Sequence, residues 1–421
     1  MSYRSAAAMT LSLAVFAHNA APMDQVRAGT RDARDLHAWL ENQPRGPGIQ
    51  AGPVLWQPTL PVALRYDDNI FASNARDVDD FVFGITPSLL ASAKGDGHEF
   101  ALSAYTRSDV YFDETRQDNT EYGASAFARV RLLDWLHVSG RYRFDQLTED
   151  WDSPDIPLGA AEPPDVEQIY TKLGMHLRFG RFSQDTDFTH VDVTYDNVPA
   201  LGGGSIRQDV RNRDYVDVGF TFAWQLTPAL QPFVRLRWND HSYDNAPPLA
   251  LADRDGDGHA LFGGVNFDLA QNIAGSVYGG YVFQDFDDDD RALEEADGIG
   301  FGAEIDWRLS SVTTLNLDAL REIEEATTGL ESGRFTTTVW VGGEHRLTDQ
   351  LALEALFGYA NDDYVGTPRD EDTFRVRLSA TQELGHDLYS QLMWSYGDRD
   401  SNAPGRSYDR NQIMLSFGWR R

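Results

Sequence analysis

Cysteine is absent from this chain of 421 residues, and lysine occurs only at Lys94 and Lys172. The lack of cysteine excludes disulfides, thiolate zinc sites and cysteine nucleophiles. Positive charge is scarce in general, because 36 Lys and Arg stand against 66 Asp and Glu, giving a net charge of −30. Binding to duplex nucleic acid needs a basic surface, so we expect no nucleic-acid partner. Aromatic residues make up 12% of the chain, which is too many for an acidic disordered protein.

Long apolar runs are also missing, since no stretch approaches the roughly 18–20 residues of a membrane-spanning helix. A shorter apolar run, 6–16, follows Arg4 and precedes a patch of small residues. This layout is typical of a secretory signal peptide, so we expect residues 1–21 to be removed on export. Residues 22–58 predict a periplasmic segment with a short amphipathic helix. This segment is either a simple tether without a partner, or a docking helix or a partial plug of the pore.

The dominant signal from residue 59 onward is a period of two. Near the C-terminus, apolar Ile413, Leu415, Phe417 and Trp419 alternate with more polar neighbours, and 137–145 and 213–226 behave alike. Strict alternation of this kind predicts strands with one apolar and one wet face.

The connections between these strands alternate between two kinds. Tight turns are expected near Gly95, Asp134, Ser183, Pro228, Gln271, Ser310, Asp349 and Gly385. Nine longer acidic stretches separate them, so the pattern predicts about 18 strands. Short turns on one side and long loops on the other are typical of outer-membrane proteins. Residues 59–421 are therefore expected to form an all-β, antiparallel, up-and-down transmembrane barrel with short periplasmic turns and long extracellular loops. Aromatic residues near the strand ends fit lipid-boundary girdles: Trp135, Trp224, Trp238, Trp307, Tyr359, Trp394 and Trp419.

A short motif near the start of this region carries a family resemblance. It consists of Asp67, Asp68, Asn69, Ile70 and Phe71, and it is followed by Thr-Pro-Ser around Pro87. With its surrounding strands, the motif resembles the putative β-barrel porin type 2 family. The resemblance implies an outer-membrane barrel belonging to an exopolysaccharide biosynthesis or export locus. The family offers no catalytic residues to transfer to this chain.

The strand faces opposite the apolar ones are rich in arginine. The expected basic lumen wall consists of Arg129, Arg131, Arg141, Arg143, Arg178, Arg235, Arg237, Arg375 and Arg377. Acidic residues, among them Asp192, Asp217, Glu304, Asp318, Glu344 and Glu354, are expected on the same face of other strands. Guanidinium groups bind carboxylates and phosphates in a bidentate manner, so the wall could guide an anionic sugar polymer. Alternatively, it is the ordinary charged lining of a porin.

Two features suggest metal or catalytic chemistry without completing it. Asp253, Asp255 and Asp257 have the spacing of a calcium loop, but Gly264 stands where a bidentate Glu would be required. We therefore expect a solvated acidic loop and no metal. His190 and Asp192 share a strand face, but no nucleophile motif accompanies them. The prediction is a protein that is not an enzyme and carries no cofactor.

Three functions remain open at this stage. The first is export or assembly of an exopolysaccharide, with the lumen as a conduit or as a platform for periplasmic partners. The second is a general diffusion porin for small solutes, and the third is a surface structural or adhesive barrel. All three place the chain in the outer membrane of a Gram-negative bacterium, in contact with lipid and lipopolysaccharide. The first adds polysaccharide and periplasmic export proteins as partners.

Overall fold

The computed structural model describes residues 46–244, 254–270, 272–287, 293–326, 331–385 and 387–421. The expected signal peptide and the expected helix of the N-terminal segment lie outside these residues. Among the described residues, no helix is long and apolar enough to cross a membrane.

The described chain consists almost entirely of strands joined in sequence order. The strands are β1 Ile49–Ala51, β2 Val54–Asp67, β3 Asp80–Ile85, β4 Ser88–Gly95, β5 His98–Tyr111, β6 Asn119–Leu133, β7 Leu136–Thr148, β8 Asp165–Phe179, β9 Phe182–Tyr195, β10 Val198–Pro199, β11 Ser205–Ile206, β12 Arg213–Trp224, β13 Leu230–Tyr243, β14 Gly256–Leu269, β15 Ile273–Gln284, β16 Ala296–Arg308, β17 Thr313–Glu325, β18 Gly333–Arg346, β19 Leu351–Tyr364, β20 Asp370–Glu383, β21 Leu388–Ser401 and β22 Tyr408–Arg420.

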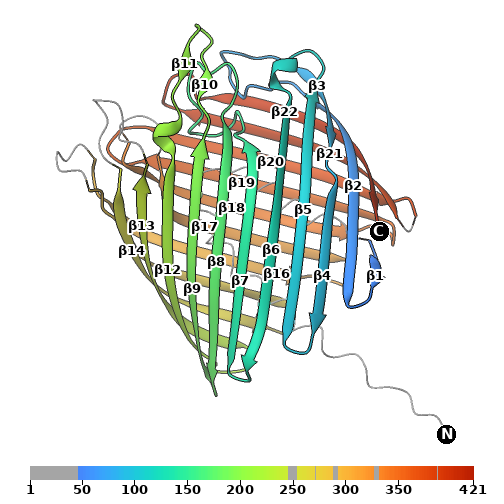
Figure 1. The fold of residues 1–421 in the computed structure, drawn as a ribbon, viewed down its shortest axis with the longest axis vertical. Helices are drawn as coiled ribbons and strands as arrows, with labels where there is room; N and C mark the ends of the chain where they lie inside the picture. The colour runs from blue at the N-terminus through green and yellow to red at the C-terminus, as the bar shows by residue number, and fades with distance from the viewer. Residues whose placement is uncertain (1–45, 245–253, 271, 288–292, 327–330, 386) are drawn as a thin grey trace.

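All of these strands except the short β1 and the separate β10–β11 hairpin form an antiparallel barrel, which has 18 strands when β3 and β4 are counted as one and confirms the predicted fold class. The chain runs round the barrel until β22 returns beside β2, from Thr59 opposite Arg420 to Asp67 opposite Gln412 (Figure 1). β3 and β4 act as one barrel strand, because both pair with β2 on one edge and β5 on the other. They are interrupted at Pro87, which has no N–H to donate to a ladder.

The two faces of the barrel differ as the alternation predicts. On β22, Ile413, Leu415, Phe417 and Trp419 point outward and are 37–51% exposed in the isolated chain. All seven aromatic residues expected at the strand ends belong to this exposed outer set. A band of apolar side chains on the outside suits a hydrocarbon environment, while polar side chains fill the inside.

The two ends of the barrel are joined differently. Short turns lie at one end, and long loops lie at the other, where the β10–β11 hairpin stands above the rim (Figure 1).

One expected turn is displaced, because Ser183 lies inside β9 and the chain reverses at Gly180, whose φ of +63° suits glycine. Gln271 lies outside the described residues. The first barrel strand begins at Val54, five residues before the expected boundary at 59, because the turn at Gly52 places 54–58 in β2.

The family motif closes the seam between the first and last strands. The fully buried Asp67 carboxylate accepts hydrogen bonds from Arg410 at 2.6–3.1 Å and from Gln412 at 2.7 Å. Asp68 accepts from the backbone and side-chain nitrogens of Asn411, and Asn69 donates to a backbone carbonyl of the same strand, that of residue 409. The motif therefore joins residues about 340 positions apart in sequence.

Replacing Asp67 by alanine should weaken barrel closure. The change leaves the Arg410 guanidinium buried without its main carboxylate, a loss of about 3–5 kcal/mol. We expect a lower urea midpoint, measured by the gel mobility difference between folded and heat-denatured protein. The matched control, Asp96→Ala, changes an exposed carboxylate in a short turn and should leave the midpoint unaltered. Equal midpoints for the two variants would contradict the role of Asp67.

Candidate functional site

One long loop enters the lumen instead of extending outward. It comprises residues 149–164 and connects β7 to β8. Its segment 153–156 is buried, with Asp155 only 1% exposed. Around the barrel, β7 is the fifth strand and β18 the fourteenth of eighteen, so they face each other across the lumen. Asp155 contacts Arg334 of β18, which shows that this lumen loop crosses the barrel.

Arginines of β18–β22 and of the connections between these strands hold the lumen loop in place. The six that bind it are Arg334, Arg369, Arg375, Arg399, Arg406 and Arg410. The Arg334 guanidinium lies 3.1 Å from the Asp155 carboxylate, and Arg375 lies 2.5 Å from that of Asp152. Arg399 donates to the Asp152 carbonyl at 2.6 Å. Four of the six, those on or next to β18, β20 and β21, bind side-chain or backbone oxygens of residues 152–155. The middle of the loop is therefore held by this part of the barrel wall.

The near end of the lumen loop is anchored by a separate ion pair. The two terminal guanidinium nitrogens of Arg211 each donate to Glu149 at 2.9 Å, and Arg211 is 1% exposed. Arg211 also stacks over the Tyr195 ring at 3.9 Å from its centroid. Bidentate arginine–carboxylate pairs are strong and directional, so this contact sets where the loop turns inward.

The family motif contacts the lumen loop as well. Phe71 packs edge-to-face on Trp151, with ring centroids 5.2 Å apart, and Arg410 lies 3.4 Å from Asp150. Ile70 and Phe71 are almost fully buried in this cluster. The motif therefore joins barrel closure to the position of the loop.

The tip of the β17–β18 hairpin also leaves the barrel wall. β17 pairs with β16 only as far as Arg321, opposite Phe301, whereas β16 continues beside β15 to Ala296. Beyond that point, Phe335 of the hairpin packs on Phe262 of β14 in a buried cluster. The hairpin tip thus folds inward against the β14–β15 wall and narrows the mouth from the opposite side.

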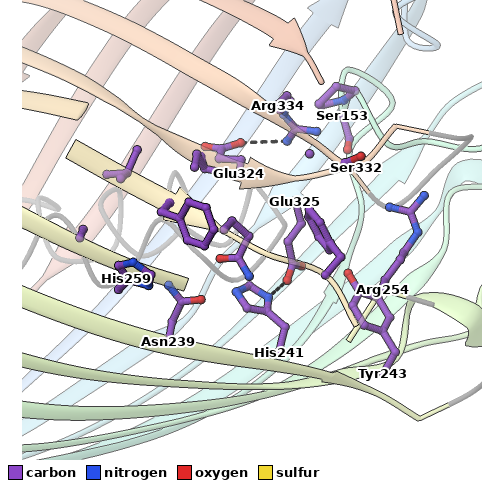
Figure 2. A pocket seen from close by; sticks show the side chains of 18 residues that line it. Ser153, Asn239, His241, Tyr243, Arg254, His259, Glu324, Glu325, Ser332 and Arg334 are labelled. Carbon is purple, nitrogen blue, oxygen red and sulfur yellow. Dashed lines mark hydrogen bonds and ion pairs between the residues drawn. The ribbon is translucent and has the colours of Figure 1, made fainter. Parts of the chain in front are cut away.

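The lumen side of this hairpin carries charges that are paired internally. Arg334 lies 2.8 Å from Glu324, and a dashed line marks this ion pair in Figure 2. Glu325 is ion-paired to Arg213 and to His241 on β12 and β13. The mouth is therefore filled by a network of buried arginines and carboxylates rather than by a wide aqueous opening.

The environment of the loop fixes its charge state. Burial by itself raises the pKa of Asp155, but Arg334, and more weakly Arg211 and Arg369, lower it to about 2. Burial lowers the pKa of Arg211, and Glu149 and Tyr195 more than offset it, so that pKa is raised. Both groups remain ionised at neutral pH.

All nine predicted lumen arginines occupy inward-facing positions, but the structure does not make them one surface. Arg143 is paired with Asp145 at 2.7 Å and Arg237 with Asp217 at 2.5 Å, while Arg375 holds the lumen loop. The remaining six lie nearer the short turns or at mid-height: Arg129, Arg131, Arg141, Arg178, Arg235 and Arg377. Four of these six arginines lie on β6–β8, and Lys172 of β8 pairs opposite one of them, Arg141. We term these five residues the lower basic wall: Arg129, Arg131, Arg141, Lys172 and Arg178.

An acidic wall faces the lower basic wall at the same height. Its members lie on β16–β19: Glu304, Asp306, Asp318, Glu344 and Glu354. Glu304 lies directly opposite Asp318, and Glu344 opposite Glu354, which places like charges side by side. Because β6–β8 and β17–β19 are nine strands apart, the opposite charges create an electric field across the lumen.

Asp192 is not part of the lumen, contrary to the sequence-based expectation. It shares the outward face of β9 with His190, which is 2.8 Å from Asp214 of the next strand. The strand alternates inward Thr189 and Val191 with outward His190 and Asp192, so both polar groups lie outside. The expectation was wrong because polar residues also occur on the outer face near the long-loop rim.

The calcium-like loop shows no assembled ligand set. Asp253 lies outside the described residues, Asp255 accepts a hydrogen bond from the Tyr243 backbone nitrogen at 2.6 Å, and Asp257 is already in β14. No cluster of three or more His, Asp or Glu suited to a metal ion occurs within the described residues.

The residues that hold the lumen loop were not singled out from the sequence, apart from Arg375. The other five lie near strand ends: Arg334, Arg369, Arg399, Arg406 and Arg410. From sequence alone, an arginine at such a position looks like an ordinary solvent-exposed charge at the barrel rim. The loop segment Asp-Trp-Asp-Ser-Pro-Asp at 150–155 was the available signal, because it places a large aromatic residue among carboxylates.

Neutralising the loop carboxylates should open the barrel. The double change Asp152→Asn and Asp155→Asn removes two ion pairs worth about 3 kcal/mol each. The ratio of barrels with the loop held in the lumen to barrels with the loop released should therefore fall at least about a hundredfold. Single-channel recording in planar bilayers would show this as a larger and longer-lived conductance. Glu162→Gln is the control, because Glu162 belongs to the same loop but its ion pair, with Arg116 of the β5–β6 connection, is exposed. Equal conductance in both variants would show that Asp152 and Asp155 do not hold the lumen loop in place.

Acid should release the loop only at low pH. The folded pKa of Asp155, about 2, lies below the unfolded value of about 3.9, so its stabilising effect is complete above that value and is lost as pH falls toward 2. We expect conductance that changes little from neutral pH to about pH 4 and rises below it. The Asp155→Asn variant should lose most of this acid-dependent rise. A transition of the same size in that variant would exclude Asp155 as its source.

Comparison with known proteins agrees with this architecture. Residues 43–421 match the family described as Putative beta-barrel porin 2. No curated protein matches the chain. Similar solved structures include OccK3 (OpdO) from Pseudomonas aeruginosa, with 13% identity, coverage of 87% of this chain and 96% of that chain, and a TM-score of 0.45. The siderophore receptor PirA from the same species has 7% identity, coverage of 87% and 80%, and a TM-score of 0.44.

These structural likenesses carry no argument about what passes through the lumen. The family match, by contrast, covers the whole barrel and extends to the last residue given. The chain therefore belongs to the Putative beta-barrel porin 2 family, a family of porin-like outer-membrane β-barrels.

Proposed function

We propose that the protein is a gated outer-membrane channel that exports an exopolysaccharide bearing anionic groups. Its short turns face the periplasm, and its long loops face outward in a Gram-negative envelope. The observation that carries the proposal is the lower basic wall at the periplasmic end of the lumen. Within the described chain, Arg129, Arg131 and Arg178 form no ion pair, so they present their charge to the lumen.

The wall suits a chain of carboxylated or sulfated sugars. A planar guanidinium binds such groups with two parallel hydrogen bonds, and a row of them offers successive subsites. Phe127 lies between Arg129 and Arg141, whose guanidinium carbons are 5.6 and 5.5 Å from its ring centroid. An aromatic face beside the charges gives the apolar side of a sugar ring a surface to pack on.

A small-solute porin is the second candidate, and one observation favours it. The lumen loop crosses the barrel and narrows it, and the opposed acidic and basic walls produce a transverse field beneath it. A narrow charged passage sorts small ions and solutes by charge. The adhesive-surface hypothesis has no comparable support, because the lumen loop and the β17–β18 tip point inward.

Neutralising the four arginines of the lower basic wall should distinguish polymer export from small-solute transport. Changing Arg129, Arg131, Arg141 and Arg178 to Gln should reduce anion enrichment in the lumen by about tenfold, seen as a shifted reversal potential across a salt gradient. The control is Arg207→Gln, an exposed arginine in a long loop.

The same variants should then be tested for secretion in a deletion strain. Export predicts that polymer is lost from the medium or accumulates in the periplasm, that the wild-type gene restores secretion and that the four-residue variant restores it poorly. Normal secretion in the deletion strain, with altered ion selectivity in the variant, would instead establish the small-solute porin. Unchanged selectivity and unchanged secretion would overturn both roles of the wall.

A further inference from the structure

A pocket lies at the long-loop mouth, above the lower basic wall. It contains about 930 Å³ of empty space, a figure that includes its opening to solvent. Figure 2 shows Asn239, His241 and Tyr243 of β13 on one side and Glu324 and Glu325 of β17 on the other. The lumen loop contributes Ser153 and Pro154 to its lining.

The charged groups around this pocket already have partners within the protein. Glu325 is bound by Arg213 and His241, and Arg334 is bound by Asp155 and Glu324. Arginine and carboxylate are thus balanced around the cavity. A carboxylate ligand would meet Glu324 and Glu325, and a cationic ligand would meet the arginines, so net charge on a ligand gains little here.

One neutral group in the pocket differs from these. Asn239 is 4% exposed, and its Oδ1 accepts no hydrogen bond from any described residue. A buried amide oxygen without a partner destabilises the folded protein, and a ligand that donates a hydrogen bond to it would remove that cost. Gly258 lies beside it, and a Cβ there would come within 2.7 Å of Asn239 Nδ2 and 2.3 Å of Gln284 Oε1. Glycine therefore preserves the space next to two amide side chains.

The part of the pocket next to Asn239 is apolar, because Ala260 and Val282 follow Gly258 and Gln284 on the same inner face of β14 and β15. Ala260 and Val282 line it and belong to the buried cluster of Phe262 and Phe335, while Ile323 packs against that cluster. A ligand for this cavity therefore needs hydrogen-bonding groups next to an apolar face. A pyranose ring has both, with hydroxyls around its rim and C–H groups on its face.

We propose that this mouth pocket binds one or two residues of a neutral, hydroxyl-rich saccharide, with the Asn239 amide as its polar anchor. The site goes beyond the proposed export function and does not depend on the direction of transport. It is distinct from the lower basic wall, which lies toward the other end of the barrel and selects for negative charge. A bound saccharide would also contact Ser153 and Pro154, which gives it direct access to the lumen loop.

Equilibrium binding to the detergent-solubilised full-length protein tests the proposal. The probes are immobilised neutral oligosaccharides built from hexose and N-acetylhexosamine units, with uronic-acid and free-amine saccharides on the same array. We expect retention of neutral members, little dependence on salt, and an affinity at least about tenfold weaker after Asn239→Ala. The control is Asn266→Ala, an amide on the inner face of β14 that lies outside the pocket and donates to Gln231 at 3.1 Å.

A second variant keeps the test informative if Asn239→Ala alters folding. Ala260→Phe fills the pocket from its apolar side and should abolish binding while the folded gel mobility remains. Failure of every neutral saccharide to bind would overturn the proposal, as would unchanged affinity in both pocket variants. Binding of charged saccharides alone would overturn it too. None of these results bears on secretion in the deletion strain, so failure of the pocket and failure of the export function remain distinguishable.

Discussion

Hydrocarbon offers no hydrogen-bonding partner to a peptide group, and this constraint determines the rest of the structure. Each strand that faces lipid must pair on both edges, so the first strand has to meet the last. The chain meets this requirement through β2 and β22, and it reinforces the seam with the Asp67–Arg410 pair. Residues that look like a short acidic motif in sequence are therefore the point at which the barrel closes.

The same seam determines what happens inside the barrel. Arg410 binds both Asp67 and Asp150, so closure of the wall and placement of the lumen loop share one guanidinium. Arginine suits this role because it stays charged when buried and can serve several acceptors at once. The result is a mouth held by paired charges above a lumen whose lower walls remain oppositely charged.

Much of the fold could be predicted from the sequence, because strand alternation and turn length are local properties. The outward Ile413-to-Trp419 series and the alternation of short and long connections were enough to predict 18 strands. The lumen loop could not be predicted in this way. Its contacts join Asp155 to Arg334 and Asp152 to Arg375, pairs separated by 179 and 223 residues, and no local pattern indicates which arginine meets which carboxylate. Strand parity placed the nine lumen arginines on the inner face, but it could not show that Arg143 and Arg237 are neutralised there.

The position of the lumen loop is the central claim, and the absence of cysteine makes it directly measurable. Leu158 of the loop lies beside Gly405 in the β21–β22 connection, across the mouth from the strands that carry the loop. Spin labels at Leu158→Cys and Pro404→Cys should broaden each other's continuous-wave EPR spectrum in the folded, bilayer-reconstituted protein. The broadening should disappear when Asp152 and Asp155 are both changed to Asn. A spectrum equal to the sum of the two singly labelled proteins, without that change, would show that the loop lies outside the lumen.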